Sequence, residues 1–252
     1  MNGRALTLHR TGVESARLRL ICWPYAGGSA ANYAEWRRAF DNVEVGIAEL
    51  PGRRRSASHL RLLTFDEMAT AAVDMVGPFT DFPLVFFGHS MGALLAYEVA
   101  CRVAAEGTPA ALFVSGSTAP HLARPPSRLS DLPDPEFVDA VGHYGGIPAE
   151  VLDAPDVLSL FLPALRADFA LLEDYRYIPR PPLSCPVFVY GGRDDRYVAP
   201  SQLEAWRDIA TDVRAVELFP GGHFYLTEHR TQLLAAIRTA LSQLAITPSR
   251  RW

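Results

Sequence analysis

The sequence contains few cysteines, only three in 252 residues. Cys22, Cys101 and Cys185 are odd in number and far apart, and each lies in an apolar stretch. This pattern favours small buried side chains over a disulfide or a metal ligand. We therefore expect a protein of a reducing compartment, the cytoplasm. A chain of 252 residues is also long enough to bury roughly 70 to 75% of its extended surface in one core.

An excess of charge of either sign is also missing. The chain has 24 Lys and Arg against 28 Asp and Glu, a formal net charge of −4 and a pI near 6.0. Nucleic acids and anionic membranes require broad basic surfaces, so neither is an expected partner. Charged residues interrupt the first twenty positions, where a secretory signal needs an unbroken apolar centre. The longest apolar window without charge, 82–97, contains polar residues and glycines, so no membrane span is predicted.

Short apolar runs alternate with segments of helical length along most of the chain. Strands that are apolar throughout are buried on both faces, and their alternation with helices indicates a mostly parallel sheet covered by helices. We interpret residues 1–252 as a single doubly wound α/β domain without internal repeats. The expected strands are 19–23, 43–48, 84–87, 111–114, 186–190 and 213–219, and the expected helices are 30–40, 65–76, 93–105, 203–209 and 226–244.

The alternation breaks at about residues 121–182, where prolines are frequent and no strand is predicted. A long insertion at the carboxyl ends of parallel strands lies where α/β proteins bind ligands, so we expect a helical lid hinged at Gly145 and Gly146. Its main helix should be kinked by Pro163. An apolar stripe at helical spacing either lines a substrate channel, with Phe161, Leu165 and Phe169 as candidates, or is simply buried. The stripe consists of Leu158, Phe161, Leu162, Leu165, Phe169 and Leu172.

Residues 84–96 combine a strand, the turn Gly88-His-Ser-Met-Gly92 and a helix in immediate succession. A Gly-x-Ser-x-Gly turn in this context holds its serine in a strained conformation at the end of a strand, and its glycines let the strand and the helix pack closely. We therefore expect Ser90 to be a nucleophile. An incidental serine in a glycine-rich turn is the alternative.

A serine nucleophile needs a base to take its proton and a third group to orient that base. Of the seven histidines, only His223 and His229 lie beyond the last two strands. His223 lies in the loop that leaves a strand at its carboxyl end, where it can reach Ser90, whereas His229 lies in the following helix. His223 is the expected base. His89 should point away from the Ser90 hydroxyl and serve packing.

The acid should follow an earlier strand. Residues 114–120, after the strand that follows the nucleophile helix, contain no carboxylate, but the next strand leads into Gly192-Arg-Asp-Asp195. Gly192, Asp195 and Val198 complete the hydrolase turn Gly-x-x-Asp-x-x-Val. Asp195 is therefore expected to orient His223, and Asp194 is the alternative.

Two backbone N–H groups should stabilise a tetrahedral intermediate. One is expected from Met91, directly after the nucleophile. The other should come from the glycine-rich loop 22–29, where we assign it to Ala26, with Tyr25 as the alternative. This loop lacks the Lys-Ser/Thr of a phosphate-binding loop, and no His, Cys and acidic residues have metal-ligand spacing, so no metal or cofactor is expected.

Together these motifs resemble the discrete type II, or editing, thioesterases of polyketide and nonribosomal peptide synthases, which have the α/β-hydrolase fold. The resemblance spans nearly the whole chain. It departs from the family at Tyr25, where histidine is usual, which affects the oxyanion loop but not its backbone donors. The matching segments are 24–30, 50–53, 88–92, 162–168, 192–195 and 221–225.

The resemblance implies that the serine takes an acyl group from the phosphopantetheine thiol of an acyl or peptidyl carrier protein and that water then releases it, which clears stalled or misprimed synthases. The phosphopantetheine belongs to the substrate, and we expect a monomeric enzyme. The residues alone support only a serine acyl hydrolase, so an esterase of free small esters or acyl-thioesters is the alternative. A terminal cyclising domain is less favoured, because the first expected strand begins near residue 17 and leaves no room for a fused carrier upstream.

Three consecutive arginines, Arg53, Arg54 and Arg55, follow the expected strand 43–48 at its carboxyl end. Arginine binds phosphate and carboxylate through paired hydrogen bonds. We therefore expect these residues to receive an acidic carrier protein or the phosphate of its prosthetic arm. A solvated loop is the alternative interpretation.

Overall fold

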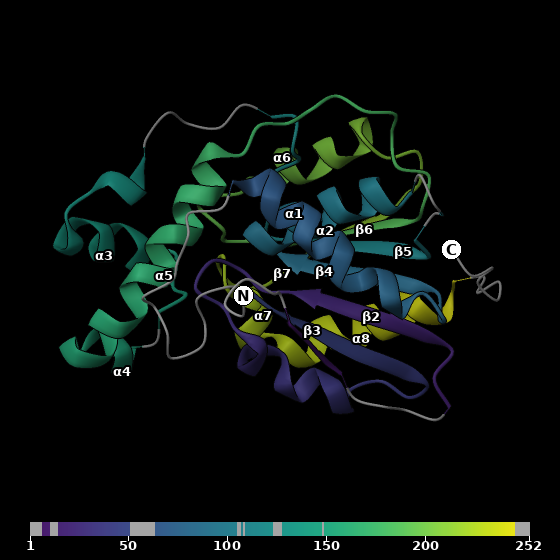
Figure 1. Cartoon of the computed structure of the whole chain (residues 1–252), viewed down its shortest axis with the longest axis horizontal. Helices are drawn as coiled ribbons and strands as arrows, with labels where there is room; N and C mark the ends of the chain where they lie inside the picture. Colours follow the sequence, from purple (N-terminus) through teal and green to yellow (C-terminus); the bar gives the residue numbers. More distant parts are fainter. Residues whose placement is uncertain are drawn as a thin grey trace.

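The computed structural model describes residues 7–10, 15–50, 64–104, 107, 109–122, 128–147 and 149–244. Its centre is a seven-stranded sheet in the order β1-β3-β2-β4-β5-β6-β7. Strands β2 to β7 are parallel, and β1 pairs antiparallel with β3 at one edge (Figure 1). The strands are β1 (Thr7–Arg10), β2 (Leu18–Trp23), β3 (Val43–Glu49), β4 (Leu84–His89), β5 (Ala111–Ser115), β6 (Val187–Gly192) and β7 (Val213–Phe219).

Helices cover both faces of this sheet (Figure 1). One face carries α1 (Phe65–Val76), α2 (Met91–Val103), α6 (Pro200–Glu204) and the 3-10 helix η5 (Ala205–Asp208). The other carries the 3-10 helix η1 (Ala30–Arg38), α7 (Tyr225–Glu228) and α8 (Arg230–Ser242). A short 3-10 helix, η3 (Gly77–Phe79), follows α1. In the described ranges, no helix has both the length and the apolar character of a membrane span.

The predicted doubly wound, mostly parallel α/β fold is confirmed, with differences in detail. The edge strand β1 was not predicted, and the expected helix 30–40 is a 3-10 helix. The expected helix 226–244 is divided at His229 into α7 and α8, and the expected helix 203–209 is divided between α6 and η5.

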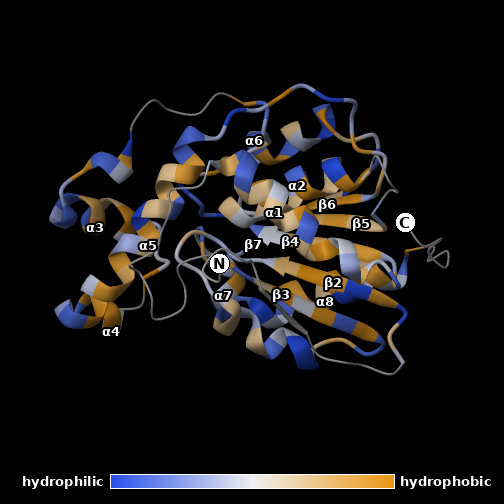
Figure 2. Cartoon of the chain, viewed as in Figure 1, coloured by the Kyte–Doolittle hydropathy of each residue, from blue (hydrophilic) through white to orange (hydrophobic). Residues whose placement is uncertain are grey.

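The sheet separates two hydrophobic cores. Every residue of β2, β4, β5 and β6 is buried, as expected for strands covered on both faces. Figure 2 shows these strands as an apolar layer between helices whose outer surfaces are hydrophilic. Trp206 of η5 lies in the core on the α2 side of the sheet, and Trp36 of η1 lies in the core on the α8 side.

The segment between β5 and β6 forms a group of helices beyond the carboxyl ends of the strands (Figure 1). It has a hydrophobic cluster of its own, to which Phe137, Leu165 and Phe169 belong. The longest helix continues through Pro163 without interruption. The helices are η4 (Leu129–Asp131), α3 (Asp134–Gly142), α4 (Ala149–Leu152) and α5 (Pro155–Asp174).

All three cysteines are free thiols. Cys22 and Cys185 are buried, and Cys101 on α2 is half-buried. Burial raises the pKa of Cys185 to about 12 and raises the pKa of Cys22 further above its ordinary value. Burial is also the largest cause of the raised pKa of Cys101. None of the three is therefore a reactive thiolate at neutral pH.

Candidate active site

Ser90 lies at the sharp turn between β4 and α2, with φ +53° and ψ −119°. Such a positive φ is rare for a residue with a side chain and marks backbone strain. The packing around the turn requires glycine on both sides. A Cβ atom on Gly88 would lie 2.0 Å from the Gly92 carbonyl oxygen, and one on Gly92 would lie 2.2 Å from the Trp23 carbonyl oxygen. The close approach of strand, helix and loop thus holds Ser90 in its strained position.

His223 lies in the loop between β7 and α7. Its Nδ1 is 2.7 Å from Oδ2 of Asp195, and the two side chains are only 4% and 1% exposed. The other oxygen of Asp195 accepts hydrogen bonds from the backbone N–H groups of Tyr197 at 2.8 Å and Val198 at 3.2 Å. The carboxylate is therefore fixed by its own turn and holds the Nδ1 edge of the imidazole.

Asp194 has a different set of partners. It is exposed, its N–H donates to the Gly221 carbonyl at 2.9 Å, and its Oδ2 accepts from the Gly221 N–H at 3.3 Å. A Cβ on Gly192 would lie 2.1 Å from the Gly222 carbonyl oxygen. Asp194 therefore ties the turn after β6 to the loop of His223, whereas Asp195 contacts the imidazole itself.

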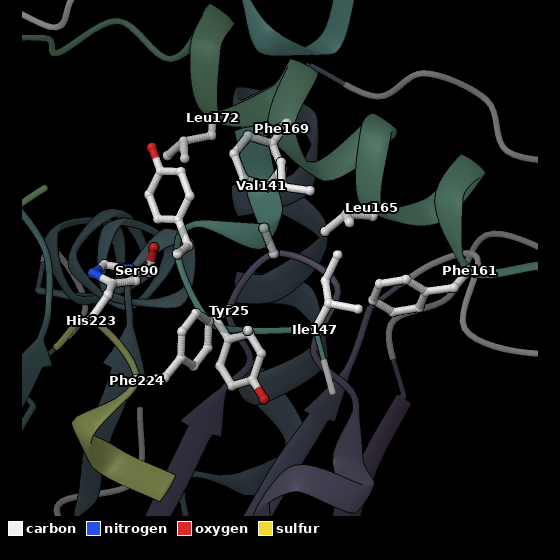
Figure 3. Close-up of a pocket in the computed structure, with 13 residues that line it drawn as sticks. Tyr25, Ser90, Val141, Ile147, Phe161, Leu165, Phe169, Leu172, His223 and Phe224 are labelled. Atoms are coloured by element: carbon white, nitrogen blue, oxygen red, sulfur yellow. The ribbon is translucent and has the colours of Figure 1, made fainter. Parts of the chain in front are cut away.

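Two cavities meet at Ser90 and His223, whose side chains lie next to each other in Figure 3. The first contains about 460 Å³ of empty space and the second about 970 Å³, including their mouths. The first is mainly apolar, and the expected channel residues Phe161, Leu165 and Phe169 line it. Polar groups occur in the second, namely Ser117, Thr118, Glu173, Tyr197 and Gln202.

The loop after β2 forms a tight turn beside the nucleophile. The Gly28 N–H donates to the Tyr25 carbonyl at 2.8 Å, and Gly27 has φ +76°, as the third residue of a type II turn requires. The Gly27 N–H donates to Asp168 Oδ2 at 2.7 Å. Neither the Ala26 N–H nor the Met91 N–H donates a hydrogen bond to any residue that the structure describes. Both are therefore available to an anionic oxygen.

His89 is fully buried behind the site. Its Nδ1 is 2.9 Å from Ser115 Oγ, which in turn is 2.6 Å from the Tyr225 hydroxyl. Burial, and secondarily the neighbouring His223, lowers the pKa of His89 well below its ordinary value. The contacts of Ser115 and Tyr225 with His89 were not predicted from the sequence. The available signal was a polar residue at the end of an otherwise apolar buried strand.

Two other predictions concern the three consecutive arginines and metal binding. Arg53, Arg54 and Arg55 lie outside the described residues. In the part of the chain that is described, no group of three His, Cys, Asp or Glu residues is arranged to hold a metal ion.

Known proteins share this sequence and structure. The Thioesterase domain family matches residues 18–241. Gramicidin S biosynthesis protein GrsT of Aneurinibacillus migulanus is 35% identical over 224 residues, which cover 88% of each chain. Among solved structures, RedJ, a thioesterase from the prodiginine pathway of Streptomyces coelicolor, matches with a TM-score of 0.83 and 37% identity over 90% of this chain and 91% of its own. The type II thioesterase BorB from the borrelidin biosynthetic cluster matches with a TM-score of 0.82 and 33% identity over 95% of this chain and 97% of its own. The family predicted from the motifs is thus confirmed, and the chain belongs to the thioesterases, among the type II enzymes.

Proposed function

We propose that this thioesterase removes acyl groups from the phosphopantetheine arm of acyl or peptidyl carrier proteins through an acyl-enzyme on Ser90. The observation that carries the proposal is the placement of His223, which has Asp195 2.7 Å from its Nδ1 and Ser90 beside its ring. Acyl transfer requires a histidine base that is oriented by a carboxylate at one ring nitrogen and lies beside the serine nucleophile.

In the proposed reaction, Ser90 Oγ attacks the thioester carbonyl while its proton moves to His223 Nε2. The carbonyl oxygen becomes an anion, which the N–H groups of Ala26 and Met91 stabilise. Asp195 holds the Nδ1–H of the imidazole and stabilises its charged form. Collapse of the intermediate expels the thiol, which takes the proton from His223. Water then attacks the acyl-enzyme with His223 as base, and the free acid leaves.

The two cavities suit such a substrate. An acyl chain is apolar, and the first cavity is lined mainly by aliphatic and aromatic side chains. Apolar walls distinguish chain lengths weakly, about 1 to 3 kcal/mol per methylene at most. Broad acceptance of acyl groups follows, which suits an enzyme that edits blocked synthases.

The helices between β5 and β6 act, in this proposal, as a lid over the site. They have their own hydrophobic cluster, apart from the two cores of the sheet. Gly146 contacts the loop of His223, since a Cβ there would lie 2.4 Å from Phe224 Cζ. The neighbouring Gly145 has φ +81°, a conformation that glycine adopts readily, and we assign the hinge of the lid to these two glycines. The single-domain organisation, the monomeric state, the cytoplasmic location and carrier docking by Arg53, Arg54 and Arg55 stay predictions from the sequence.

The decisive experiment is mass spectrometry of the protein after mixing with a slowly hydrolysed acyl thioester. We expect one acyl group on Ser90, and none in Ser90→Ala, whose residual rate should be at most about 10³ to 10⁴ times that of water. Ser117→Ala is the matched control, because Ser117 lines the second cavity and should retain acylation. Acylation at any other residue contradicts the proposed nucleophile.

The substrate class is tested separately from the nucleophile. Hydrolysis rates are compared for acyl groups on carrier proteins, on free pantetheine and in simple oxygen esters. We expect kcat/KM to be highest for the carrier-bound thioesters. If the simple esters are turned over at least as well, the enzyme is a small-ester hydrolase with the same active site.

A further inference from the structure

Asp168, on the lid helix α5, has a buried carboxylate directed at the turn that carries Ala26. The residue is 3% exposed, and its Oδ2 accepts the Gly27 N–H at 2.7 Å. The hydrogen bond joins residues 141 positions apart in the sequence. Charged acceptors form stronger and shorter hydrogen bonds than neutral ones, so this contact fixes one peptide group of the turn.

Apolar contacts reinforce the same junction. A Cβ atom on Gly27 would lie 2.7 Å from Phe161 Cζ and 2.8 Å from Leu165 Cδ1. Phe161, Leu165 and Asp168 are spaced i, i+4 and i+7, so they share one face of α5. Glycine at position 27 thus allows α5 to rest directly on the backbone of the turn.

The amides of this turn have three different fates. The Gly28 N–H closes the turn onto Tyr25, the Gly27 N–H binds Asp168, and the Ala26 N–H binds no described residue. Turns of types I and II differ in the orientation of the peptide between their two central residues, here Ala26 and Gly27. Asp168 holds that peptide with its N–H toward α5, and so selects the type II form. The Ala26 N–H belongs to the preceding peptide, which is joined to the held one at the Ala26 Cα.

We propose that Asp168 is a positioning residue for the oxyanion hole, because it ties the Ala26–Gly27 peptide to the lid helix. The inference rests on the proposed function, since it requires the Ala26 N–H to bind the oxyanion of the Ser90 adduct. It adds that the donor is held in place by α5. Seating of the lid and completion of the oxyanion hole are then one event.

The test compares two ketones of the same acyl chain. Ser90 Oγ adds to the carbonyl carbon of a trifluoromethyl ketone, the carbonyl electron pair moves to oxygen as an oxyanion, and the serine proton moves to His223. The corresponding methyl ketone binds without forming this adduct to a comparable extent. The ratio of the two affinities therefore reports the oxyanion hole, whereas a general loss of binding or of folded protein changes both affinities together.

Three variants are measured, each with its melting temperature. In Asp168→Ser the side chain is too short to reach Gly27, and we expect the affinity ratio and kcat to fall together by about 10²-fold, with KM nearly unchanged. In Asp168→Asn a neutral acceptor remains, and the affinity ratio and kcat should fall by about 3- to 10-fold. Arg166→Ala is the control on the same helix, because Arg166 binds the carbonyls of Ser130 and Leu132 inside the lid. It should lower stability and leave the ratio unchanged.

An affinity ratio equal to that of the parent protein in folded Asp168→Ser overturns the proposal. If that variant does not fold, Asp168→Asn decides, and an unchanged ratio there also overturns it. Ser90→Ala is run in parallel. If its turnover survives, the proposed function fails, whereas an unchanged ketone ratio with inactive Ser90→Ala removes only the role of Asp168.

Discussion

The imidazole rings of His89 and His223 lie with their centroids 5.0 Å apart. His89 is fully buried, and burial followed by the charge of a protonated His223 lowers its pKa well below the ordinary value. His223 has a carboxylate partner in Asp195, whereas among the described residues the partner of His89 Nδ1 is the hydroxyl of Ser115. Of the two neighbouring histidines, only His223 is therefore shown with a carboxylate that orients its ring, as the base of a serine nucleophile requires.

The first prediction concerns stability at low pH. Below the ordinary histidine pKa of 6.5, the unfolded chain binds a proton at residue 89 and the folded chain does not, so stability falls as the pH falls. This one group contributes a slope of about 1.4 kcal/mol per pH unit below that point. Urea unfolding of His89→Gln between pH 7.5 and 5 should show a shallower pH dependence than the parent. His143→Gln, at an exposed position, is the control, and equal slopes in the parent and His89→Gln would refute the prediction.

A second prediction separates the neighbouring acids. Asp195→Asn keeps the shape of the side chain but lets His223 adopt the wrong tautomer, so kcat should fall by up to about 10⁴-fold. Asp194→Asn can still accept the Gly221 N–H and should cost less than about 10-fold. Steady-state kinetics with one soluble thioester provide the comparison. The opposite ranking would mean that the acid is the residue before the one assigned.

The third prediction concerns the first cavity. Phe161 is half-buried on the wall of the cavity, whereas Phe169 also packs against Phe137 in the lid cluster. Phe161→Ala should shift the preference toward longer or bulkier acyl chains with a small loss of stability. Phe169→Ala should cost about 3 to 5 kcal/mol of unfolding free energy. Leu160→Ala, at a residue 80% exposed on the same helix, should change neither.

Rates for short and long acyl thioesters and melting temperatures decide this case. If Phe161→Ala lowers stability and leaves the relative acyl preference unchanged, the side chain is packing and not a channel wall.

A fourth prediction uses two glycines. Gly192→Ala would place a methyl group 2.1 Å from the Gly222 carbonyl oxygen, which should separate the turn of Asp195 from the loop of His223. Activity should fall at least about 10²-fold, since small displacements of catalytic groups are costly. A Cβ on Gly142, at the end of α3, would meet nothing within 4 Å, so Gly142→Ala should raise stability by about 0.4 to 1 kcal/mol. Rates and melting temperatures are measured for both variants, and similar changes in activity and stability at the two positions would contradict this prediction.

Sequence patterns predicted the parts of this site that are local. The elbow around Ser90 and the turn of Asp195 are short motifs, and the structure places Asp195 against His223. The parallel strands were predictable because they are apolar throughout. The edge strand β1 is four residues long and includes His9 and Arg10, so it lacks that signal.

What the sequence could not reveal depends on the folded chain. The hydrogen bond between Asp168 and Gly27 joins α5 to the loop after β2, and no local pattern predicts it. The buried chain from His89 through Ser115 to Tyr225 joins three separate elements. Both arise where strand ends and helices converge, so they follow from topology and not from residue spacing.

The raised pKa values of the three thiols have a consequence for handling the product. Disulfide exchange and alkylation proceed through the thiolate, and Cys22, Cys101 and Cys185 all have pKa values above the ordinary one. An enzyme that liberates a thiol at every turnover therefore does not readily exchange its own thiols with the disulfide that this product forms when an oxidant such as O₂ oxidises it. The same inertness means that a chromogenic thiol reagent can follow the released pantetheine continuously, with little background from the protein.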